Sequence, residues 1–378
     1  MKIAYVSSFD ATDIKSYSGT GYYIPEKLKE NGHQIQYIGN LSEKIGVPQK
    51  VKRKLYCLTG KKYIIDRNPH VLKKWGNFIT RQLNNDIDLI LGYSSQPFAR
   101  LNSSIPKVFW ADAVFANMVN YYPVYTNLCK ETINDGNAME KAALENCNLA
   151  ILSSDWAAEA AVKYYGISES KIKVIPYGAN IETDFSLSDI ERKAAEKSFD
   201  ICRLLFIGVE WYRKGGDIAV EAAKALNDKG IKTILSIVGV DPGEDVKNLD
   251  FVNAYGFISK STNEGQQKLN QLISESHFLI LPTRADCTPI VFNEFNAHGI
   301  PVITTREGGV PTIIKDGVNG LLFEPNSKAT DYASKINEFF KDKEAYVNLS
   351  KTSFVEYTER LNWKSAIDTF HKAVKEIL

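Results

Sequence analysis

The sequence predicts an α/β protein with two doubly wound domains, each built on a parallel sheet. Short apolar runs, each long enough for one buried strand, alternate with longer segments of helical pattern along nearly the whole chain. The order strand, loop, helix, strand is the unit from which parallel sheets are built. The chain has 378 residues, of which 44% are hydrophobic, and this supplies a core for two domains.

In the first half of the chain, the expected strands are short apolar runs at 3–7, 34–38, 88–91, 107–110, 149–152 and 173–175. One helix is expected to follow Ser18-Gly19-Thr20-Gly21 and to stop at Asn31-Gly32. Two more are expected at 134–147 and 155–165. Residues 181–200 are polar and charged, which is typical of a connection between domains.

The second half repeats the alternation. Strands are expected at 204–208, 234–238, 252–255, 278–281 and 300–304. Helices are expected at 217–228, 265–274, 289–298, 328–340, 343–350 and 353–359, and Trp363 starts the last one.

The loop and helix after the strand 278–281 suit an anion. Thr288 stands where a helix N-cap belongs, and Pro289 stands at the first helical position, where its missing N–H costs nothing. The backbone N–H groups of Ile290 and Val291 then point out of the helix start, where the helix dipole favours a phosphate. Gly299 stands where the glycine that ends a helix belongs.

Two carboxylates flank this helix start. Asp286 lies just before the cap, and Glu294 lies roughly 8 Å further along the helix axis. A sugar diphospho-nucleoside has the same layout, because its sugar and ribose hydroxyls lie on either side of the diphosphate. Carboxylates accept paired hydrogen bonds from such hydroxyls. The alternative interpretation is a turn residue at Asp286 and a solvated helix position at Glu294.

The spacing of these two acids, followed by 299–303 (GIPVI) and 308–311 (GGVP), resembles the retaining GT-B glycosyltransferases of family 4, the glycosyl transferases group 1. The resemblance covers nearly the full chain and implies two Rossmann-like domains that face a central cleft. In domain terms, it implies an acceptor domain at 1–182, a linker at 183–200, a donor domain at 201–360, and a C-terminal helix at 361–378 that packs back on the first domain. The chain departs from the family at Asp286, where Glu is usual, and at Thr288-Pro289, where Phe-Gly is usual.

The resemblance also implies roles for individual residues. Asp286 would orient the donor sugar, Glu294 would bind the ribose, and the cations of Arg213 and Lys214 would stabilise the leaving diphosphate. The donor-binding set combines the helix start with a glycine loop and a segment beside the nucleotide base: Thr288, Pro289, Ile290, Val291, Gly19, Thr20, Gly21, Gly256 and Phe257.

Asp112 is the last candidate. It follows the strand 107–110 at the carboxyl edge of the sheet, where open α/β folds bind ligands. Many relatives have a histidine near this point that contacts the donor sugar, and Asp112 is the substitute in this chain. Three alternatives stay open: Asp112 as a helix cap, the glycine loop as a flexible surface loop, and Arg213-Lys214 as a solvated helix start.

Residues 44–81 are strongly basic, with eleven lysines and arginines against one acid, Asp66, and with apolar residues interleaved. Such a segment suits anionic lipid headgroups or an anionic acceptor, although a charge run is often only a solvated face. No nucleic-acid-binding motif accompanies it, and the net charge of +1 argues against a general polyanion binder.

The five cysteines are scattered and form no CxxC pair, which indicates reduced thiols and a cytoplasmic setting. The chain starts directly with a strand and has no apolar run of about 18 residues, so no signal peptide or membrane span is expected. Peripheral contact at the inner membrane face through 44–81 remains an option. The dispersed histidines predict no metal site, and no cofactor is expected besides a UDP- or GDP-sugar as donor substrate.

The predicted function is transfer of a sugar from a nucleotide-diphosphate sugar to a hydroxyl of a glycan or lipid-linked glycan, a step of glycan biosynthesis, and the resemblance implies that the anomeric configuration is retained. The acceptor is expected at the loops 10–20, 44–75 and 112–130. Two alternatives are a sugar-nucleotide epimerase on the same scaffold, for which no further acid–base groups stand out, and a non-catalytic nucleotide-sugar binding module. The family departures at Val209, Asp286 and Pro289 keep the module open.

Overall fold

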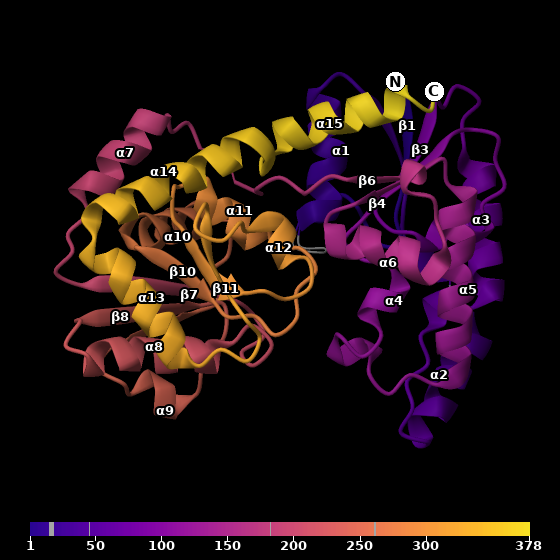
Figure 1. Cartoon of the computed structure of the whole chain (residues 1–378). Helices are drawn as coiled ribbons and strands as arrows, with labels where there is room; N and C mark the ends of the chain where they lie inside the picture. Colours follow the sequence, from indigo (N-terminus) through magenta and orange to yellow (C-terminus); the bar gives the residue numbers. More distant parts are fainter. Residues whose placement is uncertain (15–18, 45, 182, 261) are drawn as a thin grey trace. The chain divides into compact units, whose positions relative to one another are not determined.

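The computed structural model describes residues 1–14, 19–44, 46–181, 183–260 and 262–378. Residues 15–18 of the predicted acceptor loop, residue 45 of the basic segment and residue 182 at the end of the predicted first domain lie outside the described residues. The chain folds into two compact units: Met1–Asn180 with Ala366–Leu378, and Ile181–Ser365. Each unit holds one parallel sheet with helices on both faces (Figure 1), so the predicted fold class is confirmed.

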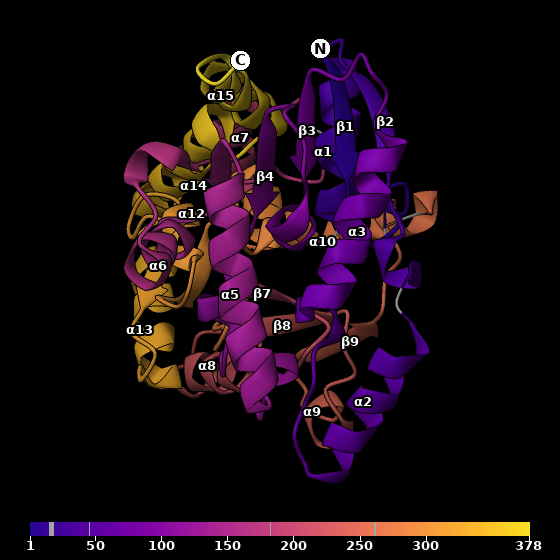
Figure 2. The same ribbon diagram turned by 90° about the vertical axis from the view of Figure 1, so that its right-hand side faces the viewer.

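The described part of the first unit has a six-stranded sheet in the order β2-β1-β3-β4-β5-β6. The helices α3 and α5 cover one face, and α1 and α15 lie on the other (Figures 1 and 2). The strands are β1 Lys2–Val6, β2 Gln34–Ile38, β3 Leu89–Gly92, β4 Lys107–Ala111, β5 Leu149–Leu152 and β6 Ile172–Val174. The helices are α1 Thr20–Glu30, α2 Val47–Leu58, α3 Pro69–Gln82, α4 Phe115–Met118, α5 Lys130–Asn146, α6 Asp155–Tyr165 and α15 Trp363–Lys375.

The last helix contributes to the core of the first unit. The ring of Phe370 in α15 stacks on Trp110 of β4, with ring centroids 6.0 Å apart and planes 5° apart. Nearby, Nε2 of His371 lies 2.7 Å from Nε2 of His33. Residues far apart in the sequence therefore form one packed unit.

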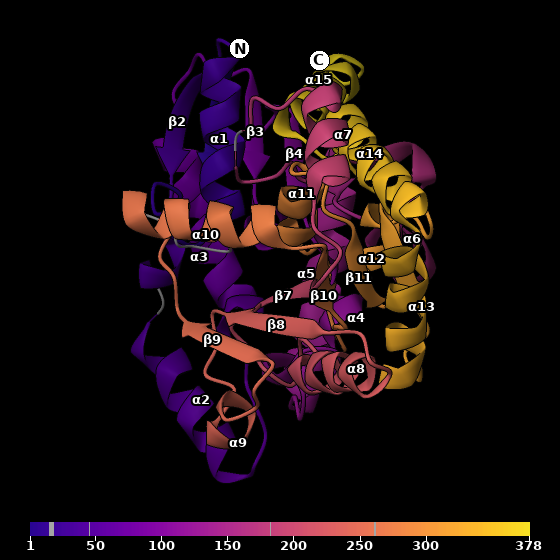
Figure 3. The same ribbon diagram turned by 90° about the vertical axis from the view of Figure 1, so that its left-hand side faces the viewer.

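The described part of the second unit has a six-stranded sheet in the order β12-β11-β10-β7-β8-β9. The helices α8 and α13 cover one face, and α10 and α11 lie on the other (Figures 1 and 3). The strands are β7 Cys202–Ile207, β8 Thr233–Val238, β9 Val252–Gly256, β10 Phe278–Leu281, β11 Val302–Thr305 and β12 Gly320–Phe323. The helices are α7 Leu187–Glu196, α8 Gly216–Asp228, α9 Glu244–Lys247, α10 Asn263–Glu275, α11 Ile290–Asn296, α12 Val310–Ile313, α13 Ala329–Lys341 and α14 Lys343–Arg360.

Several elements of this unit differ from the prediction, and the edge strand β12 and the short helix α9 were not expected. The single helix α14 replaces two predicted helices at 343–350 and 353–359. The predicted linker contains α7, which begins with a capping box of Ser186 and Asp189 and buries Ile190 and Ala194. A Cβ on Gly299 would lie 2.4 Å from Cγ2 of Ile190, so α7 packs closely on the turn after α11.

The strands β7 and β10 are neighbours in the second sheet, and the loops that follow them carry the candidate functional site. The two strands are parallel, with Phe278 opposite Leu204 and Leu279 opposite Leu205. All four residues of β10 are buried, which explains its continuous apolar sequence. Because parallel strands end at the same edge of a sheet, the loops after β7 and β10 meet there. Among the described residues, no helix combines the length and the hydropathy needed to cross a bilayer.

Candidate functional site at the carboxyl edge of the second sheet

The helix start after β10 lies one residue later than predicted. The helix α11 begins at Ile290, and its N-cap is Pro289, with φ −76° and ψ 101°, so the prediction of Thr288 as N-cap was wrong. The fixed φ of proline suits a position just outside the helix as well as one just inside, and here ψ is extended. Ile290 and Val291 still provide the first two amides of the helix, which have no acceptor within it.

The acid before the helix is buried and bound by cations. Asp286 has 7% of its surface exposed. Nζ of Lys214 hydrogen-bonds to its Oδ2, and Nη1 of Arg213 lies 3.8 Å from the same atom. The structure therefore brings together Asp286, Arg213 and Lys214, three of the predicted catalytic residues. The interpretation of Arg213-Lys214 as a solvated helix start is overturned, because these side chains are only 15% and 13% exposed.

Arg213 also forms hydrogen bonds to its own loop and to the loop after β10. Its Nη1 donates to Ala285 O at 2.7 Å, and its Nη2 donates to Oε1 of Glu210 at 2.8 Å. The hydrogen bond from Arg213 lowers the pKa of Glu210, which keeps this carboxylate charged. Two acids, Glu210 and Asp286, thus share the charge of Arg213 and Lys214.

A second set of contacts holds the loop after β7 against the loop after β10. Gly215 has φ +75°, and a Cβ on it would lie 2.0 Å from Pro282 O. Arg284 forms a bidentate pair with Asp217, with distances of 2.8 and 2.7 Å, and its backbone N–H donates to Arg213 O at 2.8 Å. Sequence reasoning missed Arg284 and Asp217; the Gly-Gly pair at the start of α8 was the available signal of a close approach.

Glu294 is the second acid, and it is 3% exposed, so the interpretation of a solvated helix position is wrong. Nζ of Lys260, in the loop after β9, lies 2.7 Å from its Oε1 and 2.6 Å from its Oε2. Lys260 was missed, since no motif surrounds it; the only signal is that a buried carboxylate requires a partner.

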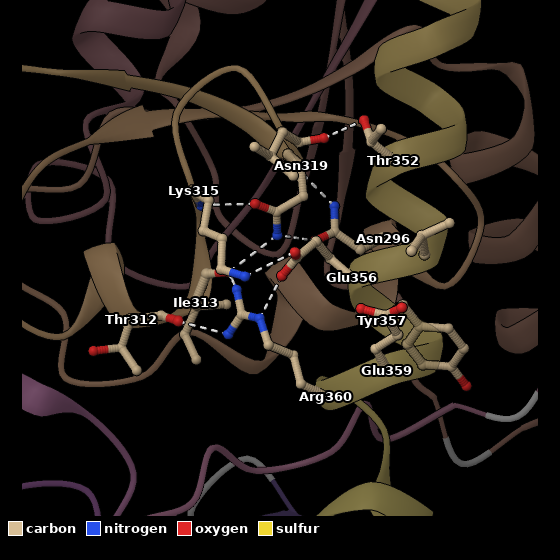
Figure 4. Close-up of polar contacts among 12 residues, drawn as sticks. Asn296, Thr312, Ile313, Lys315, Asn319, Thr352, Glu356, Tyr357, Glu359 and Arg360 are labelled. Carbon is tan, nitrogen blue, oxygen red and sulfur yellow. Dashed lines mark hydrogen bonds and ion pairs between the residues drawn. The ribbon is translucent and has the colours of Figure 1, made fainter.

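A polar cluster fixes the far end of α11 (Figure 4). Nδ2 of Asn319 donates to Oδ1 of Asn296 at 2.7 Å, and Nδ2 of Asn296 donates to Asn319 O at 3.1 Å. Both asparagines are fully buried. Glu356 of α14 accepts hydrogen bonds from Lys315 and Arg360, and Arg360 donates to two backbone carbonyl oxygens of α12. These contacts join α11, α12 and α14, so Glu294 is held on a rigid element.

The predicted base-side segment ends the edge strand of the same sheet. Gly256 is the last residue of β9, with φ +64°, and its O accepts a hydrogen bond from Gly239 N at 2.8 Å. Phe257 follows and is 75% exposed. Both residues lie at the carboxyl edge that carries Lys214 and Asp286, two strands away from β7.

The glycine segment in the first unit is mostly helical instead of a loop. Gly19 is the N-cap of α1, with φ +84°, and Thr20 and Gly21 form its buried first turn. A Cβ on Gly21 would lie 2.5 Å from Cζ of Phe9, and Tyr5 OH donates to Gly21 O at 3.0 Å. The interpretation as a flexible surface loop is therefore wrong for Thr20 and Gly21. Ser18 lies outside the described residues.

Asp112 lies in a bend directly after β4 and is partly buried. It is no helix cap, because α4 begins at Phe115 after Val114. Asp112 and the glycine segment belong to the first unit, whereas the acids and cations of the site belong to the second. Among the described residues, no group of three or more His, Cys, Asp or Glu side chains could hold a metal ion. Four of the five cysteines are buried, and Cys57 is exposed.

The sequence pattern of the family described as Glycosyl transferases group 1 matches residues 189–355. A D-inositol 3-phosphate glycosyltransferase from Thermobifida fusca is 23% identical over 251 residues, which are 63% of this chain and 57% of that protein. An uncharacterized glycosyltransferase from Methanocaldococcus jannaschii is 28% identical over 176 residues, 46% of this chain and 48% of that protein. The chain thus spans about half the length of these curated relatives.

Solved structures share the fold over the whole chain. The sucrose-phosphate synthase from Thermosynechococcus elongatus superposes with a TM-score of 0.72 at 18% identity, covering 100% of this chain and 99% of that one. The Anabaena protein HepE, solved in complex with UDP and glucose, gives a TM-score of 0.62 at 15% identity, covering 100% of both chains. At these identities the likeness shows the fold, which is GT-B.

Proposed function

We propose that the chain is a retaining glycosyltransferase of family 4, a transferase of class EC 2.4. The match of residues 189–355 to the pattern of glycosyl transferases group 1 and the GT-B fold support this proposal. The enzyme moves a sugar from a UDP- or GDP-sugar to a hydroxyl of a glycan or lipid-linked glycan. The reaction requires no metal and no further cofactor. Reduced cysteine thiols suit a cytoplasmic enzyme.

One observation carries this proposal: a buried acid, two cations and the start of α11 lie together at the carboxyl edge of the second sheet. Lys214 and Arg213 contact Asp286, which is four residues before the first helical amide, and Glu294 follows on the same helix. This arrangement supplies positive charge for a diphosphate and carboxylates for hydroxyls on either side of it.

The chemistry follows from these charges. The bond between the anomeric carbon and the diphosphate oxygen breaks, and negative charge develops on the departing phosphate. Lys214, Arg213 and the amides of Ile290 and Val291 stabilise that charge, and such stabilisation is commonly the largest catalytic contribution. An ammonium group has three N–H donors, so Lys214 can hold Asp286 and a phosphate oxygen together.

Retention follows if the acceptor oxygen attacks the anomeric carbon from the face that the diphosphate leaves. The acceptor proton then passes to a phosphate oxygen of the leaving group, so no protein nucleophile or separate base is required. Asp286, held in place by Lys214, orients the sugar by accepting hydrogen bonds from its hydroxyls.

The family resemblance supplies the remaining donor contacts of this proposal. Glu294 binds the ribose hydroxyls, and Thr288 and Pro289 form the loop that leads to the phosphate. The backbone of Gly256 and Phe257 flanks the base. For Asp112, Gly19, Thr20 and Gly21 in the first unit, a contact with the donor stays a prediction from the family resemblance.

A donor panel tests the proposal. We expect a UDP- or GDP-sugar to raise the melting temperature of the full chain, since a ligand of the folded state stabilises it. We also expect slow hydrolysis of that donor, with release of a sugar whose anomeric configuration, followed by NMR, is retained. Asp286→Asn should remove the hydrolysis, while Asp228→Asn, an exposed position at the end of α8, should not.

The possible contrary results are distinct. Inverted product contradicts the retaining mechanism alone. Donor binding without hydrolysis or transfer to any of a panel of acceptors favours the non-catalytic binding module. If none of the UDP-, GDP- and ADP-sugars changes the melting temperature, the assignment of a nucleotide-sugar site is wrong.

A further inference from the structure

The helix α2 presents its apolar side chains to solvent. Val47, Val51, Leu55 and Leu58 are 71%, 50%, 58% and 84% exposed, and no residue of α2 is buried. Their spacing of four, four and three residues places them on one face of the helix. The helix lies at the lower end of α5, away from the sheet of its unit (Figures 1 and 2).

The opposite face of α2 is polar and attaches the helix to its unit. Its half-buried positions are Gln49, Lys52 and Tyr56, spaced by three and four residues. Lys52 forms an ion pair with Glu131 at the start of α5, and Tyr56 OH donates to Oε2 of the same glutamate at 2.9 Å. A surface helix normally turns its apolar face to the core, and α2 does the reverse.

Positive charge borders the apolar stripe. The sequence of α2 contains Lys50, Lys52, Arg53 and Lys54 and no acidic residue. Lys50, Arg53 and Lys54 are exposed, and Lys50 and Lys54 lie one helical turn apart beside the stripe. An apolar stripe with cations at its border is the composition of a helix that lies flat on a membrane surface.

We propose that α2 is a docking helix for an anionic lipid bilayer. Val47, Val51, Leu55 and Leu58, the α2 stripe, enter the boundary between headgroups and acyl chains, while Lys50 and Lys54 beside the stripe contact anionic headgroups. The inference goes beyond sugar transfer and does not rest on it, because vesicle binding is measured without a donor. Within the basic segment 44–81, the proposal places the membrane contact on one helix, α2, and on the face that carries the α2 stripe.

The charge around the α2 stripe favours an anionic bilayer over a second copy of the chain as the surface that covers it. Two copies joined through the α2 stripe would bring the cations that border it close to each other, and like charges in a contact are repulsive. An anionic lipid surface neutralises the same cations, and each Lys or Arg near such a surface contributes about 1 kcal/mol, or roughly a fivefold gain in partitioning.

Vesicle flotation of the full chain tests the proposal. We expect binding to phosphatidylcholine vesicles that contain phosphatidylglycerol, and little binding to pure phosphatidylcholine. Lys50→Ser/Lys54→Ser should lower partitioning about 25-fold and reduce its salt dependence. Val51→Ser/Leu55→Ser should abolish stable binding. Because all four side chains are exposed, the melting temperature should stay unchanged.

Matched changes elsewhere serve as controls. Leu187→Ser removes an exposed leucine from α7, and Lys372→Ser/Lys375→Ser removes two exposed cations from α15; neither should alter flotation. The proposal is overturned if Val51→Ser/Leu55→Ser floats like the parent chain, or if no vesicle binds. It is also overturned if light scattering shows a dimer that this variant dissociates while vesicle binding is absent, since the stripe would then join two copies.

Discussion

Nζ of Lys260 lies 2.6 and 2.7 Å from the two carboxylate oxygens of Glu294. The glutamate is 3% exposed, whereas the lysine side chain is 48% exposed, so the lysine covers the solvent side of an otherwise buried acid. Glu294 is also the residue that we assign to the ribose. Ribose hydroxyls can therefore reach the carboxylate only when Lys260 moves.

We expect Lys260→Met to tighten the binding of UDP or GDP, whichever stabilises the chain, about fivefold. Without the lysine, the buried carboxylate has lost its partner, and ribose hydroxyls relieve that cost on binding. The 2′,3′-dideoxy form of the same nucleotide should bind the parent and the variant equally. Isothermal titration calorimetry of both nucleotides measures the difference.

Lys341→Met, at an exposed position at the end of α13, is the control and should leave both affinities unchanged. Weaker binding of both nucleotides to Lys260→Met would contradict this prediction, because Lys260 would then contact the diphosphate instead of competing with the ribose.

Lys214→Met should lower kcat for donor hydrolysis by about 100-fold, since it removes a buried cation next to the developing phosphate charge. KM should change less, because the contact gains most of its strength in the transition state. Lys214→Arg should restore part of the rate by returning the charge. The exposed Lys224→Met in α8 is the control. A Lys214→Met enzyme with parental kcat would remove Lys214 from the catalytic set.

Gly215→Ala should destabilise the chain by about 3 kcal/mol or more in urea unfolding and should weaken nucleotide binding. The substitution combines a positive φ with a Cβ 2.0 Å from Pro282 O, so the loops after β7 and β10 must separate. Gly230→Ala is matched: its φ is +79°, but a Cβ there meets nothing within 4 Å. That variant should lose only about 1 kcal/mol and keep its nucleotide affinity. If both variants lose the same free energy of unfolding, the close approach of Gly215 to Pro282 does not contribute to the cost of the substitution.

Local features of the sequence predicted the strands except β12, and they predicted the two acids, but they could not predict the partners of those acids. The run 278–281 is continuously apolar because β10 is buried between two strands, and this is visible in sequence. The pairing of Lys260 with Glu294 spans 34 residues and depends on the loop after β9. Likewise, the basic composition of 44–81 was plain, but which face of α2 points outward depends on the distant Glu131.

The stability of the chain should fall as the pH drops below 6.5, and His277 should account for part of the loss. Nδ1 of His277 accepts a hydrogen bond from Arg203 N at 3.1 Å, so in the neutral ring Nε2 carries the proton and donates to Ser198 O at 3.0 Å. Protonation would place a second N–H against the Arg203 amide. Burial, and then the charge of Lys197, lower the pKa of His277 to about 3.

The direction of the change in the free energy of unfolding with pH follows from proton binding by His277. Above pH 6.5, His277 is neutral in the folded and unfolded chains, and it contributes no pH dependence. Below 6.5, the unfolded chain binds a proton that the folded chain does not, so the free energy of unfolding falls by about 1.4 kcal/mol per pH unit until the pH approaches 3. Between pH 7 and pH 5 this single group should therefore cost about 2 kcal/mol.

Urea unfolding at pH 7 and pH 5 measures the effect. His277→Gln keeps a donor and an acceptor without a titrating group, so its loss on acidification should be about 2 kcal/mol smaller than that of the parent chain. His70→Gln changes an exposed histidine and should follow the parent. His298, whose pKa burial lowers to about 4, remains in both variants and adds the same slope to each. If His277→Gln loses as much stability as the parent between the two pH values, the acid sensitivity does not arise at this ring.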